Sequence, residues 1–172
     1  MDAIQMIRDD HNQITALFQI FDLAPDHRTK EQIAKKLILA LEVDETIEEK
    51  FVYSQIRRLK GASKLITLAE REHHDADAIM LMLSELPRSD PKFDESFAAL
   101  KRTVEPHFRR DEAEILPKAN LLNPARLKSM AEQLEKKRDE LLYQVHPVQG
   151  QKARRRARTQ QPESGEPIHF IA

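Results

Sequence analysis

The 172-residue chain contains no cysteine and only three glycines. Without cysteine it can form no disulfide, thiolate zinc site, iron–sulfur cluster or cysteine nucleophile, so any metal site has to use His and carboxylate ligands. Three glycines are too few for an all-β sandwich or a typical doubly wound α/β fold. No run approaches about 20 apolar residues, so the sequence predicts no membrane span. Residues 2–10 are acidic and lack an apolar segment, which indicates no signal peptide and a cytoplasmic location.

What the chain does contain is typical of helices. Charged residues make up 33% of it, with abundant Leu, Ile, Ala, Glu and Lys. Breakers such as Pro25, Gly61 and the Pro87–Pro91 loop divide the sequence, and Asn123 with Pro124 is a helix start signal. No segment alternates with a period of two. The pattern predicts an all-α, antiparallel up-down four-helix bundle with an additional C-terminal helix, in one domain over residues 1–146. The five helices are expected at residues 2–22, 29–58, 63–86, 92–115 and 124–145.

The C-terminal segment, residues 147–172, differs in composition from the rest. Residues 151–172 hold five basic and two acidic side chains, a net charge of +3, and little apolar content before the end. We interpret the segment as a basic tail that is disordered or loosely docked. Its run KARRRAR has no interleaved aromatic residues for base stacking, so the sequence disfavours a nucleic-acid partner. The sequence does not indicate an oligomeric state.

Ionisable side chains interrupt the apolar stripe of each of the first four predicted helices near its middle. Singly, such a residue is most often a hydrogen-bonded core histidine or a carboxylate at the edge of the core. Four helices with the same interruption instead predict a metal site, because a buried charge needs a partner or a metal. Imidazole and carboxylate ligands without sulfur suit Fe, Mn or Zn. The interrupting residues are His11, Asp44, Glu48, His73, His107 and Asp111.

Regular helix geometry ranks the neighbouring candidates. Asp111 lies about 40° from His107 around the helix and Glu112 about 140°, which favours Asp111 as the ligand. Pro106 is expected to distort the helix just before His107, so Glu112 stays an alternative. Tyr53 is interpreted as a packing residue. His74 points away from the stripe, and Glu49 is expected to face solvent or to accept a hydrogen bond from a ligand.

Four motifs appear in order along the chain: DAIQMIRDDH, VDETIEEKFVYS, EREHHDADAIM and HFRRDEAEILPKA. Together they resemble the hemerythrin-like, HHE cation-binding domain family over residues 2–145. The resemblance implies a hemerythrin-like bundle with two iron ions. The ligands that it implies are His11, Asp44, Glu48, His73, His107 and one or both of Asp111 and Glu112. The ferritin-like alternative needs Glu-x-x-His on two helices, and here only Glu70 and His73 fit it.

One position departs from the family pattern. Asp44 stands where the family usually has a ligand histidine, with Glu48 intact four residues later. A two-iron centre, a single ion, Mn or Zn in place of iron, and a vestigial site therefore all stay open.

The resemblance implies a protein that binds or responds to dioxygen, nitric oxide, or the redox or iron state. An iron-dependent oxidase or peroxidase-like enzyme is one alternative. A metal-free helical interaction module is another.

Overall fold

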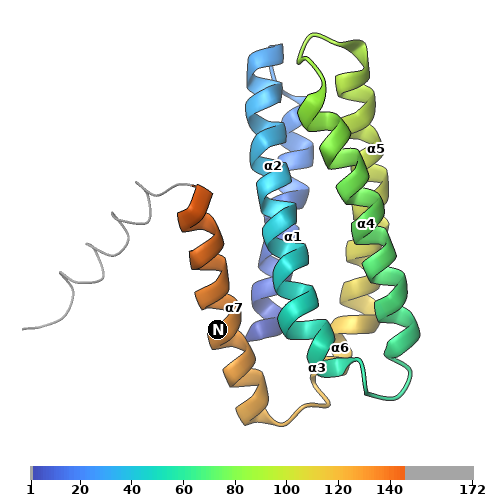
Figure 1. The fold of residues 1–172 in the computed structure, drawn as a ribbon, viewed down its shortest axis with the longest axis vertical. Helices are drawn as coiled ribbons and strands as arrows, with labels where there is room; N and C mark the ends of the chain where they lie inside the picture. The colour runs from blue at the N-terminus through green and yellow to red at the C-terminus, as the bar shows by residue number, and fades with distance from the viewer. Residues whose placement is uncertain (1, 146–172) are drawn as a thin grey trace, which may run out of the picture.

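The computed structural model describes residues 2–145. Four long helices run alongside one another in alternating directions, and a fifth packs outside them against the first two (Figure 1). The described residues form no strand, so the predicted all-α bundle with an additional C-terminal helix is confirmed. The predicted tail, residues 147–172, lies outside the described residues. The long helices are α1 (Ala3–Asp22), α2 (His27–Ile47), α4 (Ser63–Glu85), α5 (Pro91–Arg110) and α7 (Pro124–Val145).

Side-chain caps explain where several helices begin. Asp2, Asp26 and Asp90 each accept a hydrogen bond from a backbone N–H in the first turn of the helix that follows. The predicted start at Asn123 is confirmed, because its side chain accepts from the backbone N–H of Arg126. Such caps satisfy N–H groups that have no partner within the helix, and each stabilises by about 1 kcal/mol.

Two of the long helices change geometry in the middle of the bundle. α2 continues into the π-helix η1 (Glu48–Tyr53) and the short α3 (Ser54–Ile56). α5 runs through Pro106 without a break and continues into the π-helix η2 (Asp111–Ile115) and α6 (Leu116–Ala119). Both π-helices begin at a buried carboxylate, Glu48 or Asp111. Single π-helical turns are often found at functional sites.

The apolar core forms two clusters at different heights of the bundle. One includes Ile14, Phe18 and Leu41, and the other includes Ile7, Ile47 and Tyr53. α7 adds its buried residues, such as Leu134, to the second cluster only. His11, Asp44, His73 and Asp111 come between the two clusters along their helices, so a polar layer divides the core. None of the described helices is long and apolar enough to span a bilayer.

Candidate metal centre

Six of the seven predicted site residues are buried in the polar layer. Their side chains come from α1, α2 with η1, α4, and α5 with η2, so each long bundle helix contributes at least one. Burial of this many ionisable groups is unusual unless they pair or bind a metal. Their exposed fractions are His11 2%, Asp44 1%, Glu48 0%, His73 3%, His107 5% and Asp111 0%.

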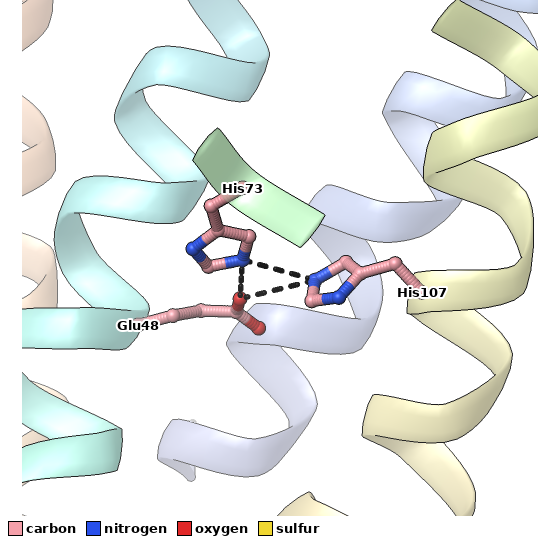
Figure 2. A group of neighbouring side chains, drawn as sticks. All are labelled: Glu48, His73 and His107. Carbon is pink, nitrogen blue, oxygen red and sulfur yellow. Dashed lines mark hydrogen bonds and ion pairs between the residues drawn. The ribbon is translucent and has the colours of Figure 1, made fainter. Parts of the chain in front are cut away.

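Glu48 lies at the centre of this group. The Nε2 atom of His11 is 3.3 Å from its Oε1, and the Nε2 atoms of His73 and His107 are 3.4 and 3.8 Å from its Oε2. The two Nε2 atoms of His73 and His107 are 3.0 Å apart, and the three groups point toward one point (Figure 2). Ligand atoms that share a metal with bonds of about 2.1 Å lie roughly 3 to 3.5 Å apart. Glu48, His73 and His107 are therefore spaced to hold one ion.

A second group of three shares Glu48 with the first. His11, Glu48 and Asp111 each place one nitrogen or oxygen atom within 4.8 Å of the others. All three residues are buried. Since Glu48 belongs to both groups, the arrangement fits two neighbouring ions that share one carboxylate.

Each of the three buried histidines also has a carboxylate on its other ring nitrogen. Nδ1 of His11 lies 2.9 Å from Glu112, Nδ1 of His73 lies 2.9 Å from Glu49, and Nδ1 of His107 lies 3.1 Å from Glu72. A carboxylate on Nδ1 favours the proton there and leaves Nε2 with a free lone pair for a metal.

The two candidates on η2 face different parts of the site. Asp111 is fully buried among the inner groups, whereas the Glu112 side chain is 39% exposed and reaches the outer nitrogen of His11. The expectation that Glu49 accepts a hydrogen bond from a ligand histidine agrees with its contact to His73.

Tyr53 is part of the polar layer and does not serve only as packing. Its hydroxyl lies 3.0 Å from Oε2 of Glu48 and 2.9 Å from Oδ1 of Asp111. A hydroxyl has one proton, so it can donate to only one of the two carboxylates at a time. Tyr53 therefore reduces the repulsion between two buried carboxylates that face each other.

A family model described as the hemerythrin HHE cation binding domain matches residues 2–119. The chain belongs to the hemerythrin HHE family. A search of curated proteins gives no match. Among solved structures, the chain is similar to a hemerythrin HHE cation binding domain-containing protein from Mycobacterium kansasii, with 23% identity and a TM-score of 0.70. The similarity covers 87% of this chain and 94% of that one, which supports the fold.

Several buried carboxylate oxygens of this hemerythrin-family site have no hydrogen-bond partner. Both oxygens of Asp44 and one oxygen of Asp111 are buried and have no hydrogen-bond partner. The nearest ion-pair contact of Asp44 is His11 Nε2, at 3.6 Å. Burial, with the charge of Glu48, raises the pKa of Asp44 to about 8 and raises that of Asp111 well above its usual range. A cation placed among these groups would supply the missing partner, so the donor set fits a metal.

The histidines of the site titrate far from their usual range. Burial opposes their protonation, but hydrogen bonds to Glu48 outweigh it and raise the pKa of His11 to about 10, of His73 to about 11 and of His107 to about 9. The same contacts outweigh the burial of Glu48 and hold its pKa well below the usual range. In the absence of a metal, the contacts with Glu48 therefore favour protonated histidines.

Sequence reasoning missed two of these contacts. Glu72 binds Nδ1 of His107 and pairs with Arg110, which anchors it. The Glu72-His73 pair of the third motif could have indicated this contact, but of the two residues only His73 was predicted to belong to the site. The role of Tyr53 followed from π-helical geometry, which the regular 3.6-residue period does not predict.

Proposed function

We propose that the protein binds a pair of non-haem iron ions in the polar layer. Glu48, His73 and His107 would hold one ion, and His11, Glu48 and Asp111 the other, with Asp44 beside His11. The observation that carries this proposal is the convergence of three Nε2 atoms on Glu48, with a carboxylate behind each ring. Membership in the hemerythrin HHE family supports a cation at this place. Imidazole with carboxylate suits iron, although the same donors also accept Mn and Zn.

We propose further that the centre binds or responds to a small diatomic molecule such as dioxygen or nitric oxide. Iron, when bound, supplies the redox and ligand-binding chemistry. The chain's own residues keep bulk water out, since the inner groups are at most 5% exposed. Glu49, Glu72 and Glu112 orient the imidazole rings through Nδ1. Tyr53 holds a proton at the two facing carboxylates.

Metal analysis with optical spectroscopy tests this function. The protein is reconstituted with Fe²⁺ without oxygen, desalted, and analysed for iron before its spectrum is recorded with and without dioxygen. About two Fe per chain are expected, with an absorption band that depends on dioxygen or nitric oxide. Glu48→Ala removes the carboxylate shared by both groups and should abolish binding. Glu95→Ala, an exposed acid on α5, is the matched control and should bind as the wild type does.

Three results would contradict the proposal. Failure of the wild type to retain iron, Mn or Zn would remove the metal centre altogether. Retention of Mn or Zn but not iron would contradict the choice of metal. Iron retained by Glu48→Ala at the wild-type level would show that the metal binds elsewhere.

A further inference from the structure

A small cavity lies between α2, α4 and α5, beside the polar layer. It leaves about 10 Å³ for the centre of a water-sized molecule, which is room for one small species. Its inner wall includes Asp44, His73 and His107, all buried, and apolar side chains such as Leu41 and Val104 complete it. The cavity therefore adjoins the group of Glu48, His73 and His107.

The mouth of the cavity is formed by its partly exposed lining residues, Glu45, Glu72 and Thr103. Two of these polar groups are already engaged. Glu72 contacts His107 and Arg110, and the Thr103 hydroxyl donates to the carbonyl of Ala99. No ion pair is found for Glu45 among the described residues. Its neighbour is a second carboxylate, Asp77, and burial together with that charge raises the pKa of Glu45 to about 9. An incoming cation would supply the positive partner that this pair of carboxylates lacks.

Asp44 places another carboxylate in the wall of the cavity, at its inner end. It lines the cavity, is 1% exposed, and has no hydrogen-bond partner for either carboxylate oxygen. Asp44 and Glu45 are adjacent on α2, one inside and one at the mouth. Oxygen ligands at successive depths can replace, in steps, the water molecules that a hydrated divalent ion must lose.

We propose that a divalent metal ion enters the bundle through this cavity, with Glu45 taking the ion from solvent and Asp44 receiving it next to His73 and His107. The proposal rests on the proposed metal centre and adds a route and a function for Glu45. A residue on the route changes how fast the ion enters and leaves, whereas a resident ligand changes how tightly the ion is held.

The test compares rates with equilibria. The full-length protein is freed of metal by chelation and mixed with Co²⁺ in a stopped-flow instrument, and absorbance follows binding. Glu45→Gln should slow uptake about tenfold, the lower range for an acidic group that concentrates a cation at a cleft. Release to a chelator should slow by a similar factor, so that the dissociation constant and the stoichiometry stay unchanged. Thr103→Phe narrows the mouth and should slow both steps as well.

Glu42→Gln is the matched control, because it removes an exposed carboxylate from α2 that does not line the cavity, and its rates should equal those of the wild type. Wild-type uptake rates in both Glu45→Gln and Thr103→Phe would overturn the route. Weaker equilibrium binding in Glu45→Gln with a normal uptake rate would show a resident ligand, which also overturns it. If the wild type binds no metal, the proposed function fails; if it binds and the rates do not change, only the route fails.

Discussion

Asp44 departs from the family pattern, and it is also the buried side chain of the site with the most polar atoms that lack a hydrogen-bond partner. A carboxylate with two buried and unpartnered oxygens destabilises the metal-free protein, because it has lost water without gaining a donor. His11 Nε2, 3.6 Å away, supplies only partial compensation. A cation beside Asp44 would supply the partner that its carboxylate lacks. Stability and metal binding should therefore respond in opposite directions when Asp44 is replaced.

Asp44→Leu tests this opposition. In the metal-free protein the variant should increase the free energy of unfolding by about 1–3 kcal/mol, because it removes a buried group without partners and extends into the adjoining cavity. Urea denaturation measures the change. In the same variant, the increase in melting temperature caused by iron should become smaller. Asp75→Leu, at an exposed position on α4, is the control and should change stability by about 0.5 kcal/mol or less. A less stable metal-free Asp44→Leu would show that the contact with His11 stabilises the fold.

Tyr53 offers a second test at the scale of single residues. Tyr53→Phe removes the proton that lies between Glu48 and Asp111 and should lower the free energy of unfolding by about 1–2 kcal/mol. Urea denaturation of the single variants Tyr53→Phe and Glu48→Gln and of the double variant gives their coupling energy. A coupling of about 0.5 kcal/mol or more is expected for groups in one hydrogen-bond network. Additive effects would mean that the hydroxyl contributes nothing through Glu48.

At the scale of helices, caps and breakers explain why the boundaries were predictable. Asp90 with Pro91 and Asn123 with Pro124 combine a side-chain cap with a proline at the first helical position. Both signals are local, so they can be read without knowledge of tertiary contacts. The apolar stripes predicted which histidines are buried for the same reason, because the spacing of a stripe is also a local pattern. The stripe of α1, for example, includes Ile7, His11 and Ile14, and the structure buries all three.

The π-helices explain what the sequence did not predict. In a regular helix, Tyr53 would lie about 140° from Glu48, five residues earlier, and would face elsewhere. The wider turns of η1 bring residues five apart onto one face, so the hydroxyl reaches Glu48. The burial of Asp111 and the partial exposure of Glu112 did follow from α-helical spacing, because η2 begins only at Asp111. A local change of period is set by the packed bundle and leaves no signal in one sequence.

α7 stabilises the bundle from outside without contributing one of the inner site residues. Its Leu134 is fully buried in the cluster that includes Ile7 and Tyr53. Leu134→Ala should therefore lower the free energy of unfolding by about 2–5 kcal/mol, as expected for a leucine cavity. Leu142→Ala, at a 40% exposed position on the same helix, should have a much smaller effect. The number of metal ions per chain should not change in folded Leu134→Ala. Loss of metal from that variant would show that α7 also fixes the site.

For the molecule as a whole, the polar layer brings the proposed metal centre and the buried carboxylates without hydrogen-bond partners to the same height of the bundle. Apolar clusters lie on both sides of it and exclude water from it. In the metal-free protein, protons on the histidines and on Asp44 compensate the buried negative charge. The fold should then depend on pH through groups that all belong to one layer.

The direction of this dependence follows from the raised pKa values of the histidines. His11, His73 and His107 have pKa values of about 10, 11 and 9, against an ordinary value of 6.5. A raised histidine pKa stabilises the folded state fully below pH 6.5, and this contribution is lost as the pH rises through about 9 to 11. The raised pKa of Asp44, about 8, acts in the same direction, because its ionisation between pH 4 and 8 favours the unfolded chain.

Urea denaturation of the metal-free protein at pH 6 and pH 9.5 measures the effect. The free energy of unfolding should be lower at pH 9.5, by an amount on the order of 2 kcal/mol. Iron should reverse the trend between pH 6 and 8, because the metal displaces the same protons and binds more tightly as they leave. Replacing His11, His73 and His107 together by Ala should reduce the first trend to the part that Asp44 contributes and remove the second, whereas replacing the exposed His74 by Ala should preserve both. Equal stability of the metal-free wild type at the two pH values would contradict this account, because protons on the site histidines would then not stabilise the fold.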